Sequence, residues 1–228
     1  MVVGNGMLAE NFSHFNNNDE FIVFASGVSN STETDPAAFN RESDLLKRYL
    51  KKSATLIYFS TVSIYDSALG GSAYIQHKKK IEILIQQHTA HYIIFRLPQL
   101  VGKTKNEHTL TNKLYTMLVS DQPISVHVNA CRYLMDVQDI VVFLTGMIIS
   151  KDYQNKTIDI NFNNQIGINN LLNIFERILN TTAKRIPVEK GGCYKSNNQE
   201  FLNYLSNIGY HLPSDYIEKV ISKYYRQL

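Results

Sequence analysis

Phe21-Ile22-Val23-Phe24-Ala25 is a continuous apolar run of the kind expected for a β-strand that is buried on both faces. Two more runs of this kind follow, at Ala54–Ser60 and Tyr92–Arg96. Helices are predicted between them, at Ala38–Lys51 and Ser72–His88, because apolar residues recur there at helical spacing. Buried strands that alternate with helices predict an α/β fold with a doubly wound parallel sheet.

The rest of the chain is less regular. Met1–Val3 predicts a short first strand, and Pro98 is expected to end the strand that begins at Tyr92. Beyond it the sequence predicts helices at 109–120 and 137–150, strands near 125–128, 132–134 and 157–161, and a mostly helical tail from 168 on. We therefore expect a sheet domain formed by residues 1–105 and 135–165, and a small region formed by 106–134 and 166–228.

The composition is that of an ordinary globular protein. The chain has 228 residues, of which 44% are hydrophobic, so it is long enough to bury a core. The formal net charge is +3, and the tightest basic cluster, Lys78-Lys79-Lys80, lies inside a predicted helix, so nucleic-acid binding is not expected. No secretory signal and no apolar run of about 20 residues is found, which predicts a cytoplasmic protein without a membrane span.

The two cysteines, Cys131 and Cys193, lie in different neighbourhoods of the sequence. Their positions match neither a metal-ligand spacing nor a disulfide framework, which predicts free thiols in a reducing compartment. No set of Asp, Glu, His and Cys has metal-ligand spacing, so no metal is expected.

The first motif with chemical meaning is Gly4-x-Gly6-x-x-Ala9. The first glycine permits a tight turn, the second permits close approach of a diphosphate to the backbone, and a small third residue permits close packing of helix and strand. Because the motif lies between a predicted strand and a predicted helix, it favours dinucleotide binding. An ordinary glycine-rich turn is the alternative.

The second motif is Tyr74-Ile75-Gln76-His77-Lys78, which puts Tyr74 and Lys78 one helical turn apart on one face. An ammonium group beside a phenol favours the phenolate, so Tyr74 is predicted to exchange a proton near neutral pH. Taken alone, such a pair is more often a pair of surface residues. Successive residues of a helix point about 100° apart, so His77 does not share the face of Tyr74 and Lys78. It is interpreted as a surface or packing residue.

A pair of hydroxyl residues, Ser60 and Thr61, follows the second buried strand. Ligand sites of open α/β sheets gather at the carboxyl ends of the strands, so a hydroxyl group here is placed to bind the oxygen that Tyr74 protonates. A turn-forming pair is the alternative reading of this motif.

In this order, the motifs resemble the extended short-chain dehydrogenases/reductases. This is the NAD-dependent epimerase/dehydratase family, which includes sugar-nucleotide epimerases, dehydratases and 4-ketoreductases. Four segments are similar to those of the family: Tyr58–Asp66 to S-(S/T)-x-x-V-(Y/F), Tyr74–Lys78 to Y-x-x-x-K, Phe95–Gly102 to R-x-x-N-V-Y-G, and Arg132–Asp139 to R-D-(F/Y)-x-x-V-x-D. The resemblance covers about Val3 to Gly146 and implies a Rossmann-like fold.

The resemblance also implies roles for individual residues. Thr61, Tyr74 and Lys78 would be catalytic. NAD or NADP would be the cofactor, contacted by Gly4, Asn5, Gly6, Met7, Leu8, Ala25, Ser26, Gly27, Asn40, Ser60, Tyr74, Lys78 and Leu97. A nucleotide-sugar substrate would be contacted by Ser63, Gln99 and Arg132. For Arg132, a structural ion pair is an equal alternative to a substrate diphosphate.

The sequence departs from the family near its start. About two further strands and a helix precede the family's counterpart of Phe21–Ala25, whereas only Leu8–Glu20 separates that strand from the glycine turn here. The second strand, whose end reads the ribose 2′ position, is therefore predicted to be absent and the Rossmann-like domain to be truncated. Gln99 also replaces the family's usual Asn.

Three functions follow from these observations. The first is an NAD(P)-dependent reductase or epimerase of a nucleotide-activated sugar, in bacterial surface polysaccharide biosynthesis. The resemblance to the family implies a homodimer formed through the helices at Ala38–Lys51 and Ser72–His88. The second is a non-catalytic dinucleotide-binding protein or partner subunit, which the shortened start favours. The third, a methyltransferase-like domain, gives no role to Tyr74 and Lys78.

Overall fold

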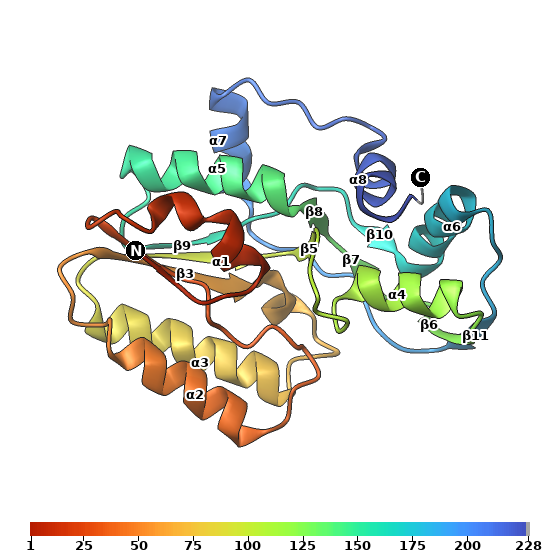
Figure 1. Ribbon diagram of the computed structural model, residues 1–228, viewed down its shortest axis with the longest axis horizontal. Coiled ribbons are helices and arrows are strands. Elements are labelled where there is room, and N and C mark those ends of the chain that lie inside the picture. The colour runs from red at the N-terminus through yellow and green to blue at the C-terminus, as the bar shows by residue number, and fades with distance from the viewer. Residues whose placement is uncertain (227–228) are drawn as a thin grey trace.

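Five parallel strands form the central sheet of the computed structural model, which describes residues 1–226 (Figure 1). The strands are β1 (Val2–Val3), β2 (Phe21–Phe24), β3 (Thr55–Thr61), β4 (Tyr92–Leu97) and β9 (Lys156–Asp159). They lie in the order β1-β2-β3-β4-β9, and every neighbouring pair is parallel. The predicted α/β fold with a parallel sheet is confirmed.

The central strands are apolar throughout because both of their faces are covered. In β2, Phe21 and Val23 point into the larger hydrophobic cluster, whereas Ile22 and Phe24 point into a second cluster on the opposite face. This alternation explains why the strand reads as a continuous apolar run in the sequence.

Helices cover both faces of the sheet. One face carries α2 (Pro36–Lys47) and α3 (Ala73–His88), and the other carries α1 (Met7–Asn11) and α5 (Val137–Ser150) (Figure 1). A 3₁₀ turn at Ser13–Phe15 continues α1 over the same face. α2 and α3 begin where the sequence supplies caps: the Asp35 side chain accepts from the Ala37 amide, and Ser72 Oγ accepts from the Ile75 amide.

The connections between neighbouring strands pass over opposite faces. β2 reaches β3 through α2, and β3 reaches β4 through α3, whereas β1 reaches β2 through α1 on the other face. From β1 to β4, each strand is added on the same side of the strand before it. Connections that cross over opposite faces of such a parallel sheet therefore have opposite hands. Right-handed crossovers make up about 98% of such connections, so the α1 connection is an exceptional, left-handed one. The longer connection from β4 to β9, which ends in α5 on the same face as α1, has the same hand.

The hand of the α1 connection is explained by the truncation predicted from the sequence. In residues 1–226, β1 pairs only with β2, and no strand lies beyond its outer edge. A helix on the α1 face would give a right-handed connection if it led outward to a further strand. Here the chain turns back and enters β2 directly.

The remaining elements extend the carboxyl end of the sheet (Figure 1). They are α4 (Leu110–Val119), α6 (Ile168–Leu179) and α8 (Tyr216–Tyr225), with three strand pairs: β5 (Gln99–Val101) with β8 (Leu134–Asp136), β7 (Cys131–Arg132) with β10 (Ile166–Gly167), and β6 (Ile124–His127) with β11 (Arg185–Val188). Pro98 ends β4 as expected, but the chain immediately forms β5, which was not predicted from the sequence.

The last third of the chain is divided between the two regions. α7 (Gln199–Asn207) packs against β9 and α5, where Phe201 contacts Phe143 at 5.8 Å between ring centroids. α6 and α8 pack against each other at the carboxyl end of the sheet. The division into 1–105 with 135–165 and 106–134 with 166–228 remains a prediction.

Candidate active site

A cavity of about 530 Å³ opens at the carboxyl ends of β1 to β4. It is lined by most of the residues that the sequence singled out: Asn5, Gly6, Met7, Leu8, Ala25, Ser26, Gly27, Ser60, Thr61, Ser63, Tyr74, Lys78, Leu97 and Gln99. Its volume is within the range of about 300–1,000 Å³ that is typical of ligand pockets. Gly4, Asn40 and Arg132 do not line it.

Gly4 does not line the cavity, but its backbone conformation positions the cavity wall. Its φ of +133° is one that side-chain-bearing residues rarely adopt, and a Cβ atom would lie 2.5 Å from the Ala25 carbonyl oxygen. Glycine therefore lets β1 approach the end of β2 and places Asn5 and Gly6 at the cavity wall.

Asn40 was expected to contact the cofactor, but it is exposed on α2 and stays outside the cavity. Successive residues of a helix point about 100° apart, so the next two residues of α2 point in other directions than Asn40. Arg41 lines the cavity, and Glu42 is completely buried beneath it. Neither residue was singled out from the sequence.

Tyr74 and Thr61 meet at the buried end of the cavity. The Tyr74 hydroxyl group faces the Thr61 side chain, whose Oγ1 accepts from the Ser63 amide at 3.1 Å. Burial raises the pKa of Tyr74 well above its usual value; the nearby Thr61 hydroxyl group opposes this rise, and the Glu42 charge adds to it.

Lys78 is held by a buried carboxylate. Its Nζ donates to Glu42 Oε1 at 3.2 Å and to the Tyr58 hydroxyl oxygen at 3.0 Å. The Tyr58 hydroxyl in turn donates to Glu42 Oε1 at 2.6 Å. Glu42 and Tyr58 come from α2 and β3, so the lysine joins three elements below the cavity.

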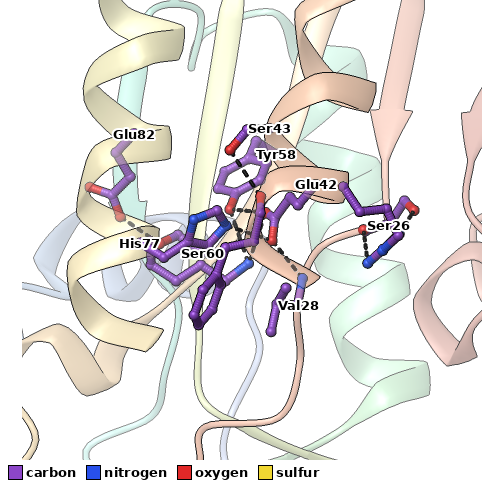
Figure 2. A network of polar contacts seen from close by, with 11 residues as sticks. Ser26, Val28, Glu42, Ser43, Tyr58, Ser60, His77 and Glu82 are labelled. Atoms are coloured by element: carbon purple, nitrogen blue, oxygen red, sulfur yellow. Dashed lines mark hydrogen bonds and ion pairs between the residues drawn. The ribbon is translucent and has the colours of Figure 1, made fainter. Parts of the chain in front are cut away.

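Glu42 is the centre of this network (Figure 2). Besides Lys78 and Tyr58, it accepts from the Val28 amide at 2.6 Å and contacts His77 Nε2 at 3.0 Å. Burial alone would raise its pKa, but the Lys78 charge and these hydrogen bonds outweigh burial and lower the pKa to about 2. Glu42 is therefore an anion that compensates the charge of Lys78.

The predicted effect of Lys78 on Tyr74 is wrong for this structure. The ammonium group lies 5.9 Å from the centroid of the Tyr74 ring, and its two closest contacts are Glu42 and Tyr58. A charge that is neutralised by a carboxylate does little to favour the phenolate. His77 is buried and packs its ring 4.7 Å from that of Phe39, and it also takes part in the Glu42 network, a role that was not predicted.

A second buried network lies beside the first, on α3 and β4. Glu82 accepts from Ser60 Oγ at 2.5 Å and forms an ion pair with Arg96 at 2.6 Å (Figure 2 shows the Ser60–Glu82 contact). Arg96 also donates to the Tyr65 hydroxyl group at 2.9 Å and lies 3.4 Å from Asp159. The Ser60 hydroxyl is thus engaged with the protein although Ser60 lines the cavity.

The predicted substrate residues are placed differently from one another. Ser63 and Gln99 line the cavity, and the Ser63 side chain lies near the Tyr194 hydroxyl group. Arg132 lies outside it, 3.3 Å from Asp66, with a second contact to the Cys131 carbonyl oxygen at 2.6 Å. Of the two alternatives for Arg132, the structure shows the ion pair.

The two cysteines form a disulfide in this structure, contrary to the prediction of free thiols. Cys131 and Cys193 are 62 residues apart in the chain, but their Cα atoms lie 4.7 Å apart. The segment after β11 returns to β7 and brings them together, which sequence spacing alone does not reveal.

The described part of the chain shows neither a metal centre nor a membrane span. Residues 1–226 contain no cluster of three or more His, Cys, Asp or Glu side chains that would hold a metal ion. Within the same residues, no helix is both long enough and apolar enough to cross a membrane.

No protein-family model and no curated protein matches the sequence. Solved structures match its fold at low sequence identity. dTDP-glucose 4,6-dehydratase from Bacillus anthracis, solved with NAD, is 16% identical with a TM-score of 0.67, and the match covers 94% of this chain and 75% of that one. UDP-glucuronic acid 4-epimerase from Bacillus cereus, solved as a point mutant with NAD and a fluorinated UDP-sugar, is 13% identical with a TM-score of 0.69 and coverages of 94% and 76%.

A third match is RMD from Pseudomonas aeruginosa, solved with NADPH, at 14% identity, a TM-score of 0.63 and coverages of 91% and 82%. In each case nearly the whole of this chain is matched, and it spans about three quarters or slightly more of the other chain. The protein therefore has the Rossmann-like fold of the NAD-dependent epimerases and dehydratases, in a truncated form.

Proposed function

We propose that the protein is an NAD(P)-dependent oxidoreductase, a reductase or epimerase, that acts on a nucleotide-activated sugar. The observation that carries this proposal is the meeting of Thr61, Tyr74 and Lys78 at one end of a cavity whose other wall is the glycine turn at Asn5–Leu8. Structures of the same fold that are solved with NAD or NADPH support the choice of cofactor.

The cavity wall fits a dinucleotide. Gly6 and Gly27 leave room at the carboxyl ends of β1 and β2, where Ala25 and Ser26 are also small. A Cβ atom on Gly27 would lie 2.8 Å from Lys78 Nζ and would fill space next to that lysine. Asn5, Met7, Leu8 and Leu97 complete the wall that would hold the cofactor.

The reaction divides between cofactor and protein. When bound, the dinucleotide supplies or accepts the hydride. Tyr74 exchanges the proton at the sugar oxygen, and Thr61 hydrogen-bonds that oxygen and orients the Tyr74 hydroxyl group. Lys78, fixed by Glu42, has two of its three N–H groups engaged by protein and keeps one to orient the bound ribose.

The substrate would enter beside Ser63 and Gln99, which line the cavity next to Thr61. The names of two structural neighbours contain a dTDP-sugar and a UDP-sugar, which supports a nucleotide sugar as the substrate class. A role in bacterial surface polysaccharide biosynthesis is the corresponding proposal for the biological process.

The turnover number of the Tyr74→Phe variant tests the catalytic role of Tyr74. The protein would be assayed with NADH and NADPH against a panel of UDP- and dTDP-sugars and their keto derivatives. We expect the variant to fold and to lose at least about 100-fold in kcat, because general acid–base catalysis contributes about 10²- to 10⁴-fold. Tyr153→Phe, which changes a tyrosine outside the cavity lining, should retain activity. Unchanged turnover in the Tyr74 variant would exclude the mechanism.

The second candidate function is non-catalytic dinucleotide binding, alone or as a partner subunit. It is favoured by the unpaired outer edge of β1 and by the neutralised Lys78. Under this alternative the wild-type protein binds NADH or NADPH but turns over no member of the substrate panel.

Two further properties are proposals. We propose a homodimer formed through α2 and α3, which lie side by side on one outer face of the sheet (Figure 1). Light scattering coupled to size exclusion would measure its mass. We propose a cytoplasmic location, for which fractionation of the source cells is the test.

A further inference from the structure

The charges around the cavity are unequal. Among the described residues none of those lining it is Asp or Glu, and the two with permanent positive charges are Lys78 and Arg41. Lys78 is compensated by Glu42 at 3.2 Å. Arg41 has no carboxylate within 4 Å anywhere in the described part of the chain, since its guanidinium group contacts only Ser26. The cavity therefore carries one uncompensated cation.

The position of this cation is fixed by the carboxyl end of β2. Arg41 Nη1 donates to Ser26 Oγ at 3.2 Å, and Nη2 donates to the Ser26 carbonyl oxygen at 3.3 Å. A guanidinium group has five N–H donors in a planar fork, so these two bonds orient it and leave three donors for a ligand. Figure 2 shows the contacts at Ser26, away from the Glu42 and Glu82 networks.

The strand that would carry the usual ribose-reading residue lies beyond β1 in the family, and residues 1–226 contain no such strand. Dinucleotide sites select NAD with a carboxylate that accepts a hydrogen bond from the ribose 2′-hydroxyl group, and they accommodate the NADP 2′-phosphate with a nearby arginine. Beyond β1 no strand supplies such a carboxylate within residues 1–226. Arg41, on α2, instead supplies a cation at the carboxyl end of β2, the strand next to β1.

We propose that Arg41 binds the 2′-phosphate of the adenosine half of the dinucleotide, so that the cavity selects NADP(H) over NAD(H). The inference rests on the proposed function, because it requires the cavity to hold a dinucleotide. A phosphate dianion has several acceptor oxygens for the free guanidinium donors, and a cavity wall without carboxylates does not repel it. A 2′-hydroxyl group offers Arg41 only a neutral partner.

The test is a pair of binding titrations with the full-length protein. Dissociation constants for NADPH and NADH would be measured by nucleotide fluorescence, for the wild type and for Arg41→Gln. We expect the wild type to bind NADPH at least about tenfold more tightly than NADH, as one hydrogen-bonded charge pair provides about ten- to hundredfold in affinity. Arg41→Gln should lose that advantage and leave NADH binding unchanged.

Arg48→Gln is the matched control. Arg48 follows the last residue of the same helix and does not line the cavity, so its replacement removes the same charge without touching the site. It should change neither dissociation constant by more than about twofold, because exposed charges contribute little.

Each other outcome is decisive. Equal affinity of the wild type for both nucleotides overturns the inference and leaves the proposed function intact. An equal loss of NADPH and NADH affinity in Arg41→Gln also overturns it, because Arg41 would then contact the diphosphate that both nucleotides share. If the wild type binds neither nucleotide at millimolar concentration, the proposed function fails and the inference fails with it.

Discussion

Lys78 Nζ lies 3.2 Å from Glu42 Oε1, and the two side chains are 3% and 0% exposed. The pair links α3 to α2 directly below the cavity and includes a residue to which the sequence motifs assign a catalytic role. It explains why Lys78 acts as a fixed hydrogen-bonding group here rather than as a free charge beside Tyr74.

Glu42→Gln keeps the size of the side chain and removes the anion that faces Lys78. Breaking a buried ion pair leaves one charge uncompensated, so we expect a loss of about 3–5 kcal/mol in the free energy of unfolding, measured by urea denaturation. Asp44→Asn, on the same helix, removes the exposed pair with Lys47 and should cost less than about 1 kcal/mol. Similar losses in both variants would contradict the assignment.

Acid should destabilise the protein through Glu42. Its pKa is about 2 in the folded protein against an ordinary value of 4.5, so its contribution to stability is complete above pH 4.5 and is lost as the pH falls towards 2. The difference corresponds to roughly 3 kcal/mol. Unfolding free energies of wild type and Glu42→Gln should therefore converge over this pH range. A gap that does not change with pH would show that Glu42 does not carry this charge.

Gly27→Ala tests the close packing above the ion pair. The new Cβ atom would lie 2.8 Å from Lys78 Nζ and 3.1 Å from Glu42 Oε1, and neither group is free to move. We expect a loss of about 1–3 kcal/mol by thermal or urea unfolding, typical of overpacking. Gly71→Ala is the control: a Cβ there meets nothing within 4 Å, so it should change stability by no more than about 1 kcal/mol.

The proton on Tyr74 predicts a pH profile for carbonyl reduction. Burial raises the pKa of Tyr74 well above its usual value, so the donating, protonated form persists and is lost only as the pH rises through that high pKa. We expect kcat/KM to show no alkaline decline below about pH 9, since this ratio reports the pKa values of the free enzyme. A decline centred near neutral pH would indicate a phenol activated by Lys78.

The disulfide predicts a thiol count. Protein unfolded without reductant should react with no equivalents of a thiol reagent at Cys131 and Cys193, and with two equivalents after reduction. Because the bond closes a loop across 62 residues of sequence separation, its removal should cost about 2–5 kcal/mol. Two reactive thiols in protein purified under air would contradict the pairing.

The sheet and its helices could be predicted from the sequence because their signals are local. Phe21–Phe24 is apolar at every position, and α3 carries a Ser72 cap and a helical apolar face. Short strands such as β5 and β10 could not be predicted, because they exist only through partners about 35 residues away, and neither has a pattern of its own.

The candidate site was predictable where a motif combined spacing with position. Tyr74, Lys78 and Thr61 were found in this way, and the cavity contains all three. Glu42 was missed because an acidic residue in a surface helix is normally solvated; its burial depends on α2, β3 and α3 packing together. Asn40 was chosen in its place because a motif gives a residue's neighbourhood more reliably than the direction of its side chain.

The order β1-β2-β3-β4-β9 also determines how the sheet can assemble. In a sheet whose strand order reverses, the chain first adds strands on one side of the first strand. A later strand must then return and pair with the free edge of that first strand. Here every new strand is added at the growing edge, beside the strand that precedes it in this sheet. No strand therefore has to return past an earlier one, which limits the loops that must close during folding.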